Sequence, residues 1–207
     1  DGVFLNGSMI VMRKQKKEYH IIASDKIRLQ GTHNLGNALA AVAAAFWSGV
    51  SVSDIAHVLR TFKGVPNRMQ KIRSIRGTDI YNDTTATTPD ATIAAVRTLS
   101  ALPKPLVLIA GGADKELDFR EWGKVISTSV STLILIPGNA TEKMKKSLAH
   151  SGTQYKECAT LDAALSFAMK REQPSTILFS PGAASYNMFK NEFDRGDQFV
   201  KLVKTLS

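Results

Sequence analysis

The fold is decided by residues 106–136, "LVLIAGGADKELDFREWGKVISTSVSTLILI". Residues 106–110 are all apolar and residues 132–136 are apolar after Thr132, and each run has the length of a buried strand. The segment between them predicts a helix over 118–129. A strand, a helix and a second strand in this order form the right-handed βαβ unit of a parallel sheet.

The alternation of strands and helices continues on both sides of this unit. Two short strands around Gly77 come first, and later segments predict helices over 89–100, 140–149 and 160–170, a strand over 176–179 and a final helical region. We therefore expect an α/β fold over residues 66–207, with a Rossmann-like, mostly parallel sheet and helices on both faces.

The first 65 residues follow a different pattern. Strands are predicted over 3–12 and 19–29, with the basic run "RKQKKE" at 13–18 as their turn. Helices follow over 35–47 and 51–62, and "KGVPNR" at 63–68 predicts a domain boundary. A hairpin and two helices need other chain to cover them, so we expect residues 1–65 to be an incomplete part of a domain.

Composition narrows the class of partner. The 207 residues carry a net charge of +9, which favours anionic ligands, and no apolar run approaches the ~20 residues of a membrane span. The basic run at 13–18 is better explained as a solvated loop than as a nucleic-acid patch, so neither nucleic acid nor a membrane is expected as a partner. Cys158 is alone, which favours a reducing, cytoplasmic setting. A first residue Asp1 instead of Met indicates a fragment or a processed chain.

Three turns should project from the carboxyl edge of the sheet, where ligands bind in open α/β folds. They are "NDTTATT" at 82–88, "GGADK" at 111–115 and "SPGAAS" at 180–185. In the first, capping explains Thr88 as the N-cap and Pro89 as the first helical residue. Capping leaves Asp83 to Thr87 unexplained, so structural and functional explanations of this turn have equal weight.

The other two turns have similar alternatives. In "GGADK", Lys115 is either a solvated lysine on a tight turn or an ammonium group beside amides that bind a carboxylate or phosphate. In "SPGAAS", Ser185 is not a hydrolase nucleophile, because it lacks the G-x-S-x-G pattern and a partner histidine. The four histidines have no metal-ligand spacing. Together the turns predict a pocket for a small dicarboxylate or amino acid.

Five segments resemble the Mur ligase family, and within it the members that add D-glutamate. They are "GTHNLGNALAA" at 31–41, "FKGVPNR" at 62–68, "YNDTTAT" at 81–87, "GGADKELDF" at 111–119 and "SPGAASYNMFKNEFDRGDQF" at 180–199. They follow the order and spacing of the family. The Asp-Asn-Pro-Arg motif of the lysine- and diaminopimelate-adding members is absent, which favours D-glutamate.

The resemblance implies a fold of three domains, of which residues 1–65 would be the end of the central ATP-binding domain and residues 66–207 the whole C-terminal domain. It also implies ATP-dependent ligation of D-glutamate to UDP-N-acetylmuramoyl-L-alanine through an acyl phosphate, in peptidoglycan synthesis. The P-loop, the UDP-binding domain and the Mg²⁺ ligands would lie upstream, in domains missing here. This piece alone is therefore not expected to catalyse the reaction.

The family pattern assigns four residues to ATP. Asn34 and Asn37 would meet the adenine, because a side-chain amide offers a donor and an acceptor together. Arg68 would contact an ATP phosphate with its planar fork. Asp83 would accept hydrogen bonds from the ribose hydroxyls.

The pattern assigns four more residues to D-glutamate. The side chains of Thr87, Lys115 and Ser185, with the amide near Tyr186, would hold its carboxylates. Lys115 would act by positioning the substrate and not by proton transfer.

The sequence departs from the family pattern at several positions. Asn67 stands where a histidine is usual, Thr84-Thr85 where Ser-Lys is frequent, and Glu192-Phe193 where Phe-Glu is common. These differences bear on the choice of amino acid. The alternatives are therefore a related ligase of the folylpolyglutamate synthase type, or a stand-alone basic binding module.

Overall fold

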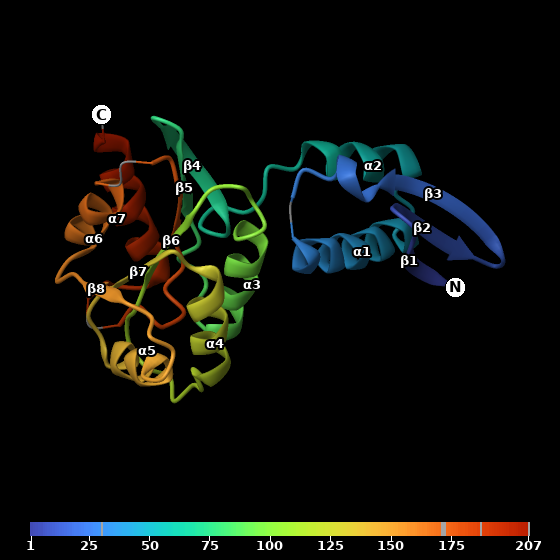
Figure 1. Ribbon diagram of the computed structural model, residues 1–207. Coiled ribbons are helices and arrows are strands. Elements are labelled where there is room, and N and C mark those ends of the chain that lie inside the picture. Colours follow the sequence, from blue (N-terminus) through green and yellow to red (C-terminus); the bar gives the residue numbers. More distant parts are fainter. Residues whose placement is uncertain (30, 171–172, 187, 207) are drawn as a thin grey trace. The chain divides into compact units, whose positions relative to one another are not determined.

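The computed structural model describes residues 1–29, 31–170, 173–186 and 188–206. The chain forms two compact units, Asp1–Gly64 and Val65–Ser207, and each has its own hydrophobic core (Figure 1). No helix in the described ranges is both long enough and apolar enough to cross a membrane.

The first unit is an antiparallel sheet with two helices. Its strands lie in the order β1 (Gly2–Asn6), β2 (Met9–Lys14) and β3 (Lys17–Ala23), followed by the short helix η1 (Ser24–Lys26), α1 (Thr32–Trp47) and α2 (Val52–Thr61). The single strand predicted over 3–12 is wrong, because a turn at Gly7, where φ is +58°, divides it into β1 and β2. The predicted strand over 19–29 also ends early, at Ala23.

The second unit contains a six-stranded sheet. Its strands are β4 (Gln70–Ile75), β5 (Thr78–Asn82), β6 (Leu106–Ala110), β7 (Thr132–Leu135), β8 (Tyr155–Glu157) and β9 (Thr176–Phe179). Its helices are α3 (Pro89–Leu99), α4 (Arg120–Ser129), α5 (Asn139–Leu148), α6 (Leu161–Met169) and α7 (Glu192–Thr205).

The strands lie in the order β4-β5-β9-β6-β7-β8, and all neighbours are parallel except the β4–β5 hairpin. The last strand in sequence, β9, therefore lies in the middle of the sheet, between β5 and β6. This order puts the ends of β5, β9 and β6 side by side.

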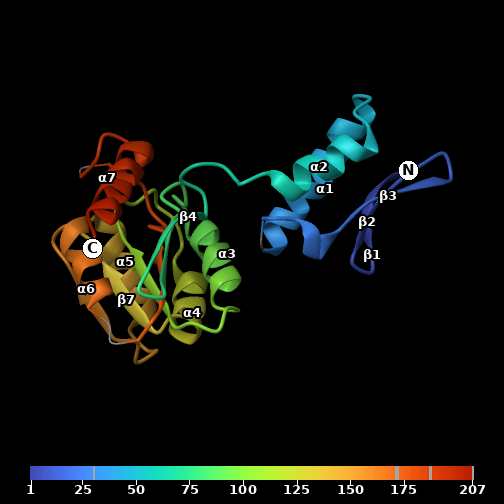
Figure 2. The same ribbon diagram turned by 90° about the horizontal axis from the view of Figure 1, so that it is seen from above.

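Helices cover both faces of this sheet, as the alternation predicted. Side chains in a strand alternate between faces, so Leu106 and Leu108 of β6 belong to a core with α3, α4 and α5, while Val107 and Ile109 belong to a core with α6 and α7. Seen from above, α3 and α4 lie on one side of the sheet and α6 and α7 on the other (Figure 2). The predicted Rossmann-like α/β fold is confirmed.

Capping residues in the sequence correctly predicted where helix α3 begins. Thr88 caps α3 by accepting a hydrogen bond from the Ala91 amide at 3.4 Å, and Pro89 is the first helical residue. One element, β8, was not predicted from the sequence, and its three residues are all exposed at the sheet edge. An edge strand with no buried face has no apolar alternation to reveal it.

Candidate functional site

The three turns singled out from the sequence lie together at the carboxyl edge of the sheet, because they follow the adjoining strands β5, β9 and β6. The ladder continues into them: the Asp83 amide donates to the Phe179 carbonyl at 2.8 Å, and the Ser180 amide donates to the Ile109 carbonyl at 3.1 Å. This edge is where open α/β sheets bind ligands.

Backbone hydrogen bonds join the turns to one another. The Gly111 amide donates to the Pro181 carbonyl at 3.0 Å, and the Gly182 amide donates to the Ala86 carbonyl at 2.9 Å. Ala113 and Ala184 form an isolated antiparallel bridge. The third turn is thus fixed to both of the others, and the three form one connected rim.

Glycine is required where the second turn approaches its neighbours. At Gly112 φ is +139°, and an added Cβ would lie 2.4 Å from the Ala184 carbonyl oxygen. At Gly111 φ is +124°, and an added Cβ would lie 2.3 Å from the Ile136 carbonyl oxygen. The glycine pair therefore permits this close backbone approach.

A buried polar network lies beneath the first and third turns. The Asp83 carboxylate, 4% exposed, accepts from the Met69 amide at 3.0 Å and from the Ser180 hydroxyl at 2.8 Å. The Ser180 hydroxyl also lies 3.0 Å from that of Thr92 on α3. Burial raises the pKa of Asp83 to about 6, although the Ser180 and Met69 hydrogen bonds and the nearby charge of Arg68 oppose the shift.

The structure brings two predicted amino-acid contacts together on the rim. The Lys115 ammonium donates to the Thr87 hydroxyl at 3.4 Å, across the second and first turns. The neighbouring Asp114 is paired with a different lysine, Lys143 of α5. Lys115 is exposed, so its ammonium group can meet a ligand from solvent.

The other two predicted amino-acid contacts differ in exposure. Ser185 is 4% exposed at the end of the third turn, whereas Tyr186 is 60% exposed. The Ser185 carbonyl accepts from the Phe189 amide at 3.2 Å, which fixes the backbone after the turn. The predicted contact through the amide near Tyr186 therefore lies on an accessible part of the chain.

Two asparagines organise the loop before β4. The Asn82 amide group donates to the Asn67 side-chain oxygen at 2.8 Å, and the Thr85 hydroxyl donates to the Asn67 carbonyl at 2.9 Å. Asn67 has φ +66°, a left-handed conformation that asparagine tolerates. Two of the departures from the family pattern, Asn67 and Thr85, thus contact each other. Arg68 follows directly and is exposed.

A buried arginine in this site was not predicted from the sequence. Arg195 on α7 is fully buried, and its guanidinium donates to Thr84 in the first turn and to the Ala183 carbonyl in the third. Burial lowers the pKa of Arg195 to about 10, with the charge of Glu192 opposing the shift. The sequence gives no local signal for this role, because the contacts with Thr84 join residues 111 positions apart.

The two residues predicted to meet adenine lie in the first unit, on the opening turns of α1. Asn34 is half-buried and Asn37 is exposed. A cavity of about 500 Å³ opens beside the start of the same helix, lined by Ser24, Asp25, Ile27, Leu29, Gly31, Thr32 and Leu35. These residues belong to the first unit, whereas the rim described above belongs to the second.

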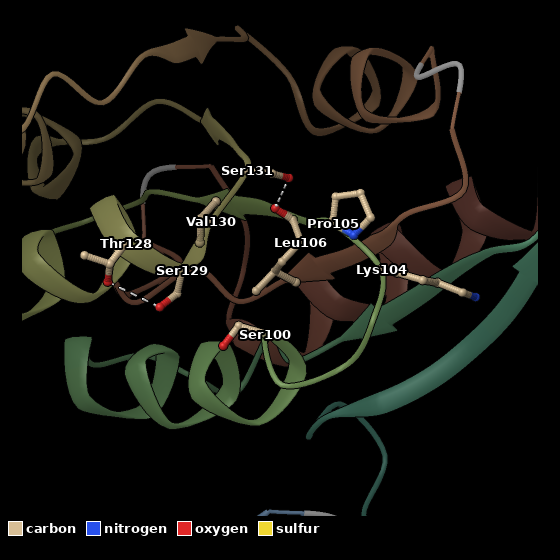
Figure 3. Close-up of a pocket in the computed structure, with 8 residues that line it drawn as sticks. All are labelled: Ser100, Lys104, Pro105, Leu106, Thr128, Ser129, Val130 and Ser131. Carbon is tan, nitrogen blue, oxygen red and sulfur yellow. Dashed lines mark hydrogen bonds between the residues drawn. The ribbon is translucent and has the colours of Figure 1, made fainter.

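A separate pocket of about 270 Å³ lies at the opposite edge of the sheet, where β6 and β7 begin (Figure 3). Its polar groups bind other parts of the protein: the Ser131 hydroxyl donates to the Leu106 carbonyl at 2.8 Å, and Lys104 is paired with Asp79 at 2.7 Å. Within the described ranges, no group of three or more His, Cys, Asp or Glu side chains could hold a metal ion. The rim, where the turns after three adjoining strands meet, is the candidate ligand site.

Known proteins resemble the chain at this site and throughout its length. The sequence profile of the family described as "Mur ligase, glutamate ligase domain" matches residues 67–183. The UDP-N-acetylmuramoylalanine--D-glutamate ligase of Roseiflexus sp. (strain RS-1) is 40% identical over 211 aligned residues, which cover 100% of this chain and 45% of the relative. The chain thus spans about half the length of the curated relatives it matches.

Solved structures agree with this assignment at the level of the fold. MurF from Acinetobacter baumannii superposes with a TM-score of 0.70 at 19% identity, over 98% of this chain and 44% of that one. MurF ligase from Thermotoga maritima, solved in complex with ADP, superposes with a TM-score of 0.63 at 14% identity, over 100% of this chain and 47% of that one. By its sequence and its fold, this chain belongs to the Mur ligase family.

Proposed function

We propose that this chain is part of an ATP-dependent ligase that joins D-glutamate to UDP-N-acetylmuramoyl-L-alanine in peptidoglycan synthesis. Val65–Ser207 would be the C-terminal domain that binds the amino acid, and Asp1–Gly64 the end of the central ATP-binding domain. The observation that carries the proposal is the rim itself, where Lys115 lies 3.4 Å from Thr87 on two joined turns.

The choice of D-glutamate rests on the relatives together with the rim. The curated relatives at 35–40% identity are named as D-glutamate ligases. An ammonium group, hydroxyls and backbone amides suit a small molecule with two carboxylates. We assign the carboxylates of D-glutamate to Thr87, Lys115 and Ser185, with the amide near Tyr186.

In the proposed reaction, the carboxylate of UDP-N-acetylmuramoyl-L-alanine takes the γ-phosphoryl group of ATP, which gives an acyl phosphate and ADP. The amine of D-glutamate then attacks the acyl carbon, an amide bond forms, and inorganic phosphate leaves. The residues of this chain would hold the amine donor at the reacting carbon. Their contribution is orientation, which converts an encounter of two molecules into a reaction within one complex.

We assign Asn34 and Asn37 to adenine, Arg68 to a phosphate of ATP and Asp83 to the ribose. The Asp83 carboxylate already accepts from Met69 and Ser180, so ribose hydroxyls would use its remaining lone pairs. We place the Mg²⁺ ligands and the P-loop in the part of the longer protein that precedes this sequence. The reaction would take place in the cytoplasm.

The test is a phosphate-release assay on the complete protein. We expect release that requires ATP, UDP-N-acetylmuramoyl-L-alanine and D-glutamate together. Release with L-glutamate or lysine in place of D-glutamate would contradict the proposal. Release with a folate and L-glutamate would support a folylpolyglutamate synthase activity instead, and tight, salt-dependent binding to random DNA would support a basic binding module.

A further inference from the structure

Arg195, near the start of α7, joins two of the three turns of the rim. Its Nε donates to the Thr84 hydroxyl at 3.0 Å and its Nη2 donates to the Thr84 carbonyl at 2.8 Å. Its Nη1 donates to the Ala183 carbonyl at 3.1 Å. One rigid guanidinium group therefore holds the first turn and the third turn at a fixed separation.

The helix that carries Arg195 is itself seated against the first turn. The Thr84 hydroxyl donates to the Glu192 carbonyl at 2.9 Å, which links the turn back to the start of α7. At the next position, a Cβ on Gly196 would lie 2.4 Å from both Asn67 Oδ1 and Thr84 Cγ2. A side chain at position 196 would have to displace those of Asn67 and Thr84, so Arg195 and Gly196 act together to seat the helix.

The hydrogen-bond acceptors of the Arg195 guanidinium are neutral, although the nearby charge of Glu192 favours its ionised form. All three acceptors are carbonyl or hydroxyl oxygens, and the ion pairs found among the described residues include none with Arg195. Taking an arginine out of water without a hydrogen-bonded carboxylate partner is unfavourable. A protein that retains such a charge beneath a ligand rim places positive potential where an anion is to bind.

We propose that Arg195 is a positioning residue for an anionic amino acid, which it serves by holding the Thr84 and Ala183 backbones and by placing a buried positive charge under the rim. The residues that would touch the amino acid follow closely in sequence, since Thr87 comes after Thr84 and Ser185 comes after Ala183. Arg195 is fully buried, so it acts through these turns and through its field. The inference rests on the proposed function.

The test compares Arg195→Met and Arg195→Lys in the complete enzyme. Methionine removes the charge and the fork, and lysine keeps the charge but cannot reproduce three directed hydrogen bonds. We expect the KM for D-glutamate to rise about tenfold or more in Arg195→Met and by a smaller factor in Arg195→Lys. The KM values for ATP and for UDP-N-acetylmuramoyl-L-alanine should stay within about twofold of the parent.

Arg73→Met is the matched control. Arg73 lies on β4 and donates from Nη1 to the Leu206 carbonyl at 2.8 Å, so it fastens the far end of α7. It has the same chemistry as Arg195 and secures the same helix, but it does not contact the rim. We expect this variant to leave the KM for D-glutamate unchanged.

A rise in the D-glutamate KM that is equalled by Arg73→Met, or that is accompanied by an equal rise for ATP, would overturn the proposal in favour of general destabilisation. An unchanged D-glutamate KM in either Arg195 variant would overturn it as well. If Arg195→Met does not fold, Arg195→Lys alone decides. If the parent enzyme releases phosphate only with another amino acid, the proposed function fails, and the Arg195 proposal is judged on the KM for that amino acid.

Discussion

Asp83 combines a carboxyl group with almost complete burial, so its ionisation is linked to the stability of the second unit. Its pKa in the folded chain is about 6, against an ordinary value of 3.8. Since the folded chain binds this proton more tightly than the unfolded chain, the stabilisation it gives is complete below about pH 4. It is lost as the pH rises through about 6.

Replacing Asp83 by Asn removes this dependence. Between about pH 4 and pH 7, we expect the unfolding free energy of the parent to fall by about 3 kcal/mol relative to that of Asp83→Asn, because asparagine has no proton to lose. Urea unfolding can be followed by the fluorescence of the buried Trp122 in a Trp47→Phe background, since the chain has 2 tryptophans. Parallel pH profiles for the two proteins would show that the carboxyl group titrates normally.

Lys115 offers a test at the level of a single ligand contact. We expect Lys115→Ala in the complete enzyme to raise the KM for D-glutamate by about tenfold or more, because an ammonium–carboxylate hydrogen bond is lost. The control is Lys124→Ala on α4, an exposed lysine that pairs with Glu121 outside the rim. An unchanged KM in Lys115→Ala would remove this residue from the amino-acid site.

At the scale of helices and strands, the sequence was sufficient to predict an element wherever its residues interact with their immediate neighbours in the chain. Thr88 and Pro89 marked the start of α3, and apolar runs marked β6 and β9. The network around Asp83 could not be predicted in the same way, because its partner Ser180 is 97 positions away. The sequence therefore placed the turns on one edge but did not show which polar groups bind each other there.

Two helical glycines allow the effect of helix propensity on stability to be distinguished from the effect of packing. Helix propensity predicts that changing either glycine to alanine stabilises the helix by about 1 kcal/mol. At Gly36 of α1 an added Cβ meets nothing within 4 Å, whereas at Gly123 of α4 it would lie 2.5 Å from the Ser147 carbonyl oxygen on α5. We expect Gly36→Ala to stabilise the first unit and Gly123→Ala to destabilise the second by about 1–3 kcal/mol.

Urea unfolding measures both effects, with Trp47 reporting on the first unit and Trp122 on the second. Each variant is compared with its parent in a background that retains only the relevant tryptophan. Stabilisation of the second unit by Gly123→Ala would mean that α4 and α5 can separate without cost.

At the scale of the whole molecule, each hydrophobic core of the described residues lies within one of the two units that divide after Gly64. Two clusters lie within the second unit and one lies within the first. We therefore expect residues 65–207 produced alone to fold, with a circular dichroism spectrum of mixed helix and strand. Their melting temperature should equal that at which the second unit unfolds within the whole chain. Loss of a cooperative transition in this piece would show that it depends on the first 64 residues.

The central place of β9 has a consequence for the way this protein is made. During translation, β5 and β6 are synthesised long before Thr176–Phe179, yet both strands pair with β9 in the folded sheet. A nascent or truncated chain that stops before Thr176 therefore displays two unpaired strand edges in what should become the middle of the sheet. Such chains should be the preferred targets of chaperones and proteases, and the interval between the synthesis of β6 and that of β9 is the one in which the protein is most vulnerable to aggregation.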